Sequence, residues 1–567
     1  MTAGGLESAL RRAARRRGLS LMLVGLLAFA GSAATSLLVQ MPQPRGHDEF
    51  SYLLGADTFA HGRLTNPPHP MWVHFESFHI IHQPTYASKY PPAQALALAL
   101  GQVIGGHAVV GVWVSSGLAC AAAYWMLLAW VPSAWALLGG LLAVATFGIA
   151  GYWSQSYWGG AVAVLGGALL FGALRRIVRR PQAHHAALLG VGLAILANSR
   201  PFEGLLVSFP AAVVLAGWSI GRNAPPARVL LGRVILPILG VLLLAAGAMA
   251  YYNLRVTGSP FRTPYQVHEA AYVREPLFVW QRPRPEPTYR HEVMRTFWDQ
   301  HFRQYLRARS IAEIPRRMFL KAYDLYRLPL GLFLLIPLVT LPWLWRNPWM
   351  TLALVTVGVL TLGHLSHAWT LPHYAAPVTG LLLALIVEGL RHIRWWQWGS
   401  RRVGGSLVAM ALVMAVLWPT GLIVRQKQWQ ELKEPTQGAR PATDLRDLPG
   451  WLLDQARRLA RPMQLHRSDW FLQRARILDQ LSRTEGRHLV IVRYRPEHDP
   501  NAEQVYNAAD IDGAKVVWAR EMDPARNCEL LDYFRERRVW LLEADARRAA
   551  LAPYPVPASG GCHRGAP

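Results

Sequence analysis

The fold is decided by residues 19–49, LSLMLVGLLAFAGSAATSLLVQMPQPRGHDE, in which an apolar run at 19–40 is followed within ten residues by the carboxylate pair Asp48 and Glu49. A run of this length can cross a hydrocarbon core about 30 Å thick. The segment before it is dense in arginine: Arg11, Arg12, Arg15, Arg16 and Arg17. Because arginine concentrates on the cytoplasmic side of membrane spans, the pattern predicts a cytoplasmic N-terminus at 1–18 and places both carboxylates at the outer mouth of the first span.

A cleavable signal peptide is the alternative for this segment. A basic start, an apolar core and small residues at 31–34 (GSAA) are typical of one. We expect a retained span instead, because the apolar run is longer than the apolar region of most signal peptides. Cleavage near Ala34 would also remove the anchor that positions Asp48.

The composition indicates a polytopic membrane protein. A length of 567 residues exceeds one ordinary domain, and 52% hydrophobic content with 23 tryptophans exceeds the average of soluble proteins. The net charge of +25 would also suit nucleic acid. The basic residues, however, mostly lie in short segments between apolar runs, where the positive-inside rule and anionic lipids account for them. We therefore expect membrane lipids, and not nucleic acid, as partners.

The apolar runs predict about eleven transmembrane helices, with a further short helix at 93–105 that lies at the membrane surface or re-enters the membrane. The predicted spans are 19–40, 107–131, 134–151, 159–174, 185–198, 204–219, 234–252, 328–345, 349–368, 374–390 and 404–424. With the N-terminus inside, the short arginine-rich connections all fall on one side. The long loops 41–92 and 253–327 then lie outside, within a transmembrane domain at 19–424.

The remainder, 425–567, is predicted to be an α/β domain outside the membrane. Alternating segments at 488–494, 514–518 and 539–542 are typical of buried strands, and 529–537 could be a helical crossover between two of them. Residues 452–481 have the spacing of amphipathic helices. We interpret this domain as a docking or substrate-guiding lid. Cys528 and Cys562 both fall in it and could form a disulfide.

Four outer elements carry the candidate chemistry. Asp48 could act as a general base toward an acceptor hydroxyl or amine, or could hold a divalent cation. The alternative is a solvated acid that caps a helix starting near Phe50. The other elements are Lys89 in KYPP, Arg200 in NSRPFE, and His373 and Tyr374 in LPHYAAP. Each could be an interfacial anchor or a helix start by itself, but their shared side favours a site.

In these motifs the chain resembles the GT-C glycosyltransferases, in particular the protein O-mannosyltransferase and lipid A aminoarabinose transferase group. The resemblance covers roughly residues 10–425 and implies a GT-C-like α-helical fold with inverting transfer from a polyprenyl-phosphate sugar. It implies that Asp48 is the acceptor-side base or a metal-binding acid, with Glu49 as its supporting carboxylate. Lys89 and Arg200 would contact the donor phosphate, together with His373 and Tyr374, which stand where the family usually has Arg-Tyr. Weaker substrate-binding candidates are Tyr90, Trp158 and Glu203.

Loop 41–92 is rich in histidine and suggests a metal. If 76–82 were helical, Glu76, His79 and His82 would follow one another at three-residue intervals and could bind Mg²⁺, Mn²⁺ or Zn²⁺, with Asp48 as a further candidate ligand. An interfacial amphipathic helix would carry the same residues on its polar rim. Trp158, in the aromatic turn at 152–158, is an aromatic-belt residue or, as the alternative, a platform for sugar stacking.

These features together predict an enzyme of the bacterial inner membrane. It would move a sugar from a polyprenyl-phosphate donor to an envelope acceptor, which could be a glycolipid, a polysaccharide or a protein. No cofactor other than a divalent metal is suggested. The competing classes are a flippase for a polyprenyl-linked glycan and a noncatalytic membrane scaffold. Internal repeats, which many transporters have, are not visible between the two halves of the chain.

Overall fold

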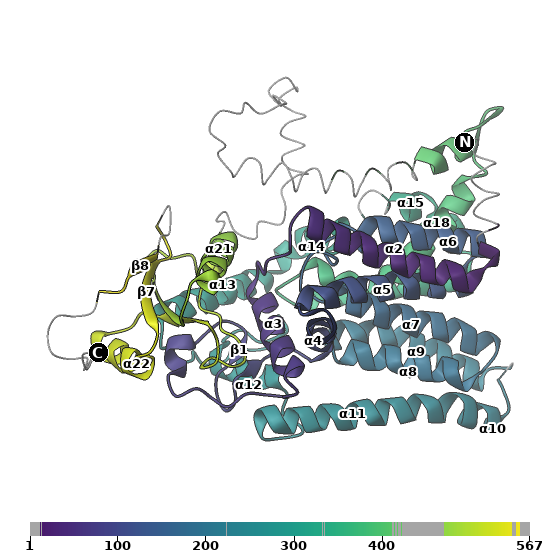
Figure 1. The fold of residues 1–567 in the computed structure, drawn as a ribbon. Helices are drawn as coiled ribbons and strands as arrows, with labels where there is room; N and C mark the ends of the chain where they lie inside the picture. The colour runs from purple at the N-terminus through teal and green to yellow at the C-terminus, as the bar shows by residue number, and fades with distance from the viewer. Residues whose placement is uncertain are drawn as a thin grey trace, which may run out of the picture.

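The computed structural model describes residues 12, 14–222, 224–330, 333, 335–410, 413, 417, 421, 470–546 and 551–555. Helices pack into a bundle, and a small β-sheet with its own helices lies at one end of that bundle (Figure 1). Cys562 and most of the predicted span 404–424 lie outside the described residues. The pairing of Cys528 with Cys562 therefore stays a prediction.

The first half of the bundle follows the predicted spans closely. Its helices are α2 (Arg17–Leu38), α4 (Ala93–Gly105), α5 (Ala108–Trp130), α6 (Ser133–Ala143, continued by a π-helical turn Val144–Gly148), α7 (Gly160–Arg179), α8 (Ala183–Ala197) and α9 (Pro201–Ile220). The largest hydrophobic core includes Tyr124, Met126, Phe147 and Phe171 of these helices, each almost fully buried, and continues into α17 (Pro348–Gly363) and α18 (Thr379–Ile393) of the second half.

The second half contains α10 (Ala227–Leu230, continued by a π-helical turn Leu231–Ile235), α11 (Leu236–Thr257), α12 (Pro264–Tyr272), α13 (Glu292–Ala308), α14 (Ile314–Leu330), α15 (Leu335–Val339), α16 (Leu341–Leu344), α17 (Pro348–Gly363) and α18 (Thr379–Ile393). Two short strands, β3 (Gln397–Trp398) and β4 (Arg401–Arg402), form a hairpin after α18.

Seven helical segments in the described part of the chain are long and apolar enough to cross a membrane, where about eleven spans were predicted. Three more apolar helices are shorter: Ala93–Gly105, Ser133–Gly148 and Ala183–Ala197. The predicted span 328–345 is instead divided among the end of α14, α15 and α16. Pro337 and Pro342 lie in this stretch, and each removes a backbone N–H from a helix, which accounts for the division.

The C-terminal body is an α/β sheet in the strand order β6-β5-β7-β8. Its strands are β5 (His488–Arg493), β6 (Val516–Arg520), β7 (Arg538–Glu543) and β8 (Leu551–Pro553), flanked by α21 (Trp470–Arg483) and α22 (Pro524–Tyr533). β5 pairs in parallel with both β6 and β7, whereas β8 is antiparallel to β7. Strands β5, β6 and β7 lie within two residues of the predicted strands 488–494, 514–518 and 539–542. The predicted crossover helix 529–537 overlaps α22 but starts and ends later than α22 does.

Helix α3 (His47–Ala60) joins this body to the bundle because it is buried on two faces. Phe50 and Leu54, four residues apart, pack in one core with Trp470, Leu489 and Ile491 of the C-terminal body. Tyr52 and Ala56, also four apart, pack with α4 and α5. Residues four apart share one face of a helix, so the two faces of α3 belong to two different cores. In Figure 1, α3 lies between the sheet and the bundle.

Loop 41–92 is irregular where a helix was suggested. After a short 3-10 turn at Trp72–Phe75, the chain forms β1 (Ile80–Ile81) and β2 (Ala87–Ser88), which pair as a small hairpin. His79 has a φ of +61°, a left-handed conformation that ends any helix. The suggestion that Glu76, His79 and His82 lie on one helix is therefore wrong.

The stacking of Phe50 predicts how firmly the two bodies are joined. The Phe50 ring lies 4.0 Å from the Tyr506 ring at 6° and is 7% exposed. We expect Phe50→Ala to destabilise the protein by about 3–5 kcal/mol, since it leaves a cavity between α3 and the C-terminal body. Thermal melting in detergent measures this. The control is Phe261→Ala, whose ring is 91% exposed, and equal melting of the two variants would contradict the joint core.

Candidate functional site

Glu49 fixes the start of α3. Its Oε2 accepts the backbone N–H groups of Arg45 at 2.7 Å and Gly46 at 3.1 Å, and its Oε1 accepts the N–H of Tyr157 at 2.9 Å. The side chain is 1% exposed. Because these bonds join the α2–α3 connection to the turn before α7, Glu49 holds together two segments that are far apart in the sequence. Every contact described for it is to the protein backbone, which suits a supporting role.

Gly46 makes the same junction possible by its small size. A Cβ on residue 46 would lie 2.6 Å from the Trp158 ring, far inside van der Waals contact. Trp158 is 4% exposed and also stacks on His373, with ring centroids 4.9 Å apart. The ring of Trp158 is therefore packed inside the protein, which favours neither the sugar platform nor the aromatic belt.

Asp48, the next residue to Glu49, faces a different environment. Its side chain is 17% exposed, and its only ion-pair neighbour among the described residues is His79, with Nε2 3.5 Å from Oδ1. Burial raises the pKa of Asp48 to about 6, while the charges of Lys89 and Arg200 act to lower it. Burial also lowers the pKa of His79 well below its ordinary value, so this imidazole is neutral at pH 7.

Lys89 lies in a cage of aromatic rings. Its Nζ is 5.2 Å from the ring centroid of Tyr90, 5.0 Å from that of Tyr265 and 5.8 Å from that of Trp298. The residue is 4% exposed, and no carboxylate forms an ion pair with it in the described part of the chain. Burial lowers the pKa of the ammonium, and the charges of Glu269, Asp48 and Glu275 act in the opposite direction.

Arg200 approaches from the bundle side, at the residue before α9. Its guanidinium lies 5.0 Å from the Tyr374 ring centroid and donates to the Trp158 carbonyl at 3.4 Å. No ion pair with a carboxylate is found for it among the residues described. Arg200 and Lys89 are thus two cations near Asp48 whose other carboxylate neighbours in the described chain act only through longer-range charge: Glu203 on Arg200, and Glu269 and Glu275 on Lys89.

Residues at the opening of the α18 segment support Arg200. His373 is 1% exposed and its Nδ1 lies 3.3 Å from the Tyr152 hydroxyl, whereas Tyr374 stacks on His364 at 5.5 Å. The contacts described for His373 are with aromatic side chains. Glu203 is buried in the first turn of α9, three residues after Arg200.

The predicted metal ligands do not converge. Glu76 accepts a hydrogen bond from the Tyr272 hydroxyl at 2.8 Å and lies 3.5 Å from Arg290, while His82 Nε2 accepts the Ser77 N–H at 3.2 Å. Only Asp48 and His79 are neighbours. Among the described residues, no group of three or more His, Cys, Asp or Glu side chains could hold a metal ion. The structure therefore does not bring the four candidate ligands together in one site, and a divalent metal stays a prediction.

The structure thus brings together Asp48, Lys89, Tyr90 and Arg200, with Glu49, Trp158, His373 and Tyr374 packed around them. Two residues that line the same region were missed. Burial, with the Asp48 charge adding to it, raises the pKa of Tyr52 to about 12; its position four residues after Asp48 on a helix could have revealed it. Tyr265 comes from loop 253–327, where no local signal marks it.

The chain matches no protein-family model and no curated protein. It is similar to solved structures of the oligosaccharyltransferase of Archaeoglobus fulgidus. One, tethered with an acceptor peptide, has a TM-score of 0.40 at 10% identity, covering 92% of this chain and 69% of that chain. Another, with Zn and sulfate, has 0.42 at 14% identity, covering 82% and 60%. A third, AglB with an inhibitory peptide and a dolichol-phosphate, has 0.37 at 11% identity, covering 83% and 62%. At these scores and identities we draw no conclusion from the likeness.

The raised pKa of Asp48 predicts a pH-dependent stability. Because the folded state keeps this proton to higher pH than the unfolded chain does, the free energy of unfolding falls as the pH rises from about 4 to about 6. A pKa of about 6 in place of 3.8 corresponds to about 3 kcal/mol. We expect Asp48→Asn to melt at a higher temperature than the wild type at pH 7.5, with the difference shrinking toward pH 4. A difference that does not change with pH would contradict the raised pKa.

Proposed function

We propose that the protein is a glycosyltransferase that moves a sugar from a polyprenyl-phosphate donor to an envelope acceptor at the outer face of the bacterial inner membrane. The observation that carries the proposal is the juxtaposition of Asp48 with two cations, Lys89 and Arg200, neither of which forms an ion pair with a carboxylate among the described residues. A buried cation without a counter-charge in direct contact is costly. A phosphate bound between the two cations would supply that contact.

The reaction needs a base on one side of the sugar and cationic stabilisation on the other. The Asp48 carboxylate takes the proton of the acceptor hydroxyl or amine as that atom attacks the anomeric carbon. The bond between the anomeric carbon and the phosphate oxygen breaks, and the leaving phosphate keeps the electron pair. Lys89 and Arg200 stabilise the negative charge that develops on this phosphate. Attack opposite to the leaving group inverts the anomeric centre.

The environment of Asp48 suits this role. With a pKa of about 6 the carboxyl is mostly ionised at pH 7 and is more basic than an exposed aspartate. His79 is neutral and lies against Asp48 without neutralising its charge. Glu49, one residue along the helix, positions Asp48 through its three backbone contacts.

The C-terminal body contributes to the same region, which supports a substrate-guiding role. The Tyr506 hydroxyl lies 2.6 Å from Nδ1 of His47, the residue before Asp48. Asp57, at the other end of α3, accepts the Ala509 N–H at 2.7 Å. Any acceptor that reaches Asp48 from outside the membrane would therefore pass close to this body.

Removing the base tests the proposal directly. Membranes containing the wild type or Asp48→Asn are incubated with radiolabelled polyprenyl-phosphate sugars and total envelope fractions. With the wild type we expect label to appear in an envelope acceptor. With Asp48→Asn we expect the rate of incorporation to fall by at least about 100-fold, the order of magnitude expected when a general base is removed. Wild-type incorporation that persists in folded Asp48→Asn would defeat the role of Asp48. No wild-type incorporation across a broad donor panel would favour the flippase or the scaffold.

In the proposed mechanism Lys89 binds the donor phosphate and also acts on the base Asp48 through its charge, which gives a second prediction. Because its charge lowers the pKa of Asp48, Lys89→Met should move the acidic limb of the pH–rate profile to higher pH and raise the KM for the donor. The matched control is Lys515→Met, an exposed lysine of the C-terminal body. A lower rate with an unmoved acidic limb would contradict the electrostatic coupling.

A further inference from the structure

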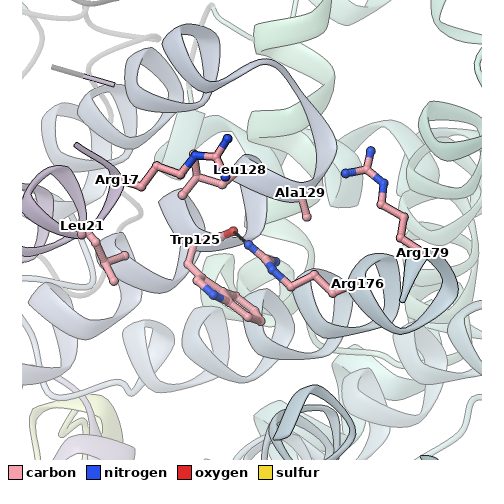
Figure 2. Close-up of a pocket in the computed structure, with 8 residues that line it drawn as sticks. Arg17, Leu21, Trp125, Leu128, Ala129, Arg176 and Arg179 are labelled. Atoms are coloured by element: carbon pink, nitrogen blue, oxygen red, sulfur yellow. Dashed lines mark hydrogen bonds between the residues drawn. The ribbon is translucent and has the colours of Figure 1, made fainter. Parts of the chain in front are cut away.

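A second charged site lies at the arginine-rich end of the bundle, away from Asp48. A cavity of about 410 Å³ opens there among α2, α5 and α7. Figure 2 shows Arg17 of α2 and Arg176 of α7 extending toward the cavity from opposite walls, with Arg179 one helical turn beyond Arg176. Since α2 has 22 residues, its two ends are about 33 Å apart, so this cavity is separate from the proposed sugar site.

The cavity is cationic, and no compensating charge is found for it among the described residues. No acidic residue of the described chain lines it, and none of its three arginines has an ion-pair partner among the described residues. Arg176 is held in place: Nη2 donates to the Trp125 carbonyl at 2.7 Å, and the guanidinium lies 3.8 Å from the Trp125 ring centroid. Like charges around one cavity repel each other, and an anion between them would relieve that repulsion.

The surroundings favour a lipid as the source of that anion. Leu21 and Leu128 give the cavity an apolar wall. Beside it, α2 exposes a continuous hydrophobic surface: Leu19, Met22, Leu23, Leu26 and Leu27, each 43–60% exposed. A free phosphate would use only the arginines, whereas a phospholipid would also cover this surface with its acyl chains.

We propose that this cavity binds the phosphodiester headgroup of an anionic phospholipid such as phosphatidylglycerol. Guanidinium groups match phosphate oxygens with paired hydrogen bonds, and basic cavities between membrane helices are typical sites for such headgroups. The bound lipid would contact both α2, the helix that precedes Asp48 in the chain, and α7. This site is independent of the proposed transferase activity.

Arg17 and Arg179 are the residues to change, because no hydrogen bond to the protein is described for either side chain. We compare the wild type, Arg17→Gln/Arg179→Gln and the control Arg228→Gln/Arg233→Gln, which removes two exposed arginines from the α10–α11 segment. Each purified full-length protein is titrated with phosphatidylglycerol or phosphatidylcholine in detergent, and bound lipid is counted by native mass spectrometry. A parallel titration uses inorganic phosphate and follows thermal melting.

We expect the wild type and the control to retain phosphatidylglycerol over phosphatidylcholine, and the cavity variant to bind phosphatidylglycerol roughly tenfold more weakly. Equal phosphatidylglycerol binding by the cavity variant and the wild type would overturn the proposal. Stabilisation by millimolar inorganic phosphate as large as that by phosphatidylglycerol would also overturn it, in favour of a free-anion site. If the double variant does not elute as a folded protein, Arg17→Gln alone carries the test, since Arg17 lies at the first residue of α2.

Discussion

The arrangement around Asp48 depends on three backbone N–H groups that donate to one buried carboxylate, Glu49. Arg45 and Gly46 belong to the connection after α2, and Tyr157 belongs to the turn before α7. Without this carboxylate, the buried N–H groups of Gly46 and Tyr157 and the partly buried N–H of Arg45 would lack this acceptor, and each unsatisfied buried group costs about 1–3 kcal/mol. Glu49 thus fixes where α3 begins, and with it the position of Asp48.

Helix α3, which begins at this point, packs against both the helix bundle and the C-terminal body. Since one of its faces lies in the C-terminal core and the other in the bundle, neither body can shift without disturbing α3. Residues far apart in sequence meet on it: Phe50 stacks on Tyr506, and Arg474 lies 5.0 Å over the Phe50 ring. The C-terminal body is for this reason part of the wall around the site, although the chain reaches it more than 400 residues after α3.

The sequence predicts local features of this site better than its assembly. The apolar run, the helix start considered near Phe50 and the strands of the C-terminal body each have a short-range pattern, and the structure has elements at or close to those positions. The irregular backbone of residues 76–82 could not be predicted, because the spacing of their polar residues suits a helix, whereas His79 has a left-handed backbone conformation that interrupts one. The sequence does not show that Glu49 and Asp48 have different roles. In the structure, backbone N–H groups from two segments that are far apart in sequence donate to Glu49. Tyr265 reaches Lys89 from another loop, and only the tertiary fold brings them together.

Both ends of the bundle have cations that form no ion pair with a carboxylate among the described residues, but they differ in what surrounds the charge. Around Asp48, the cations Lys89 and Arg200 lie against aromatic rings, which stabilise a cation without competing for an anion. A carboxylate stands beside them, so this end can accept a proton as well as a phosphate. In the described part of the chain no acid lines the cavity around Arg176, and the neighbouring surface of α2 is apolar. That end can hold an anion but offers no base, which makes it suited to anchoring a lipid and unsuited to transferring a group from one.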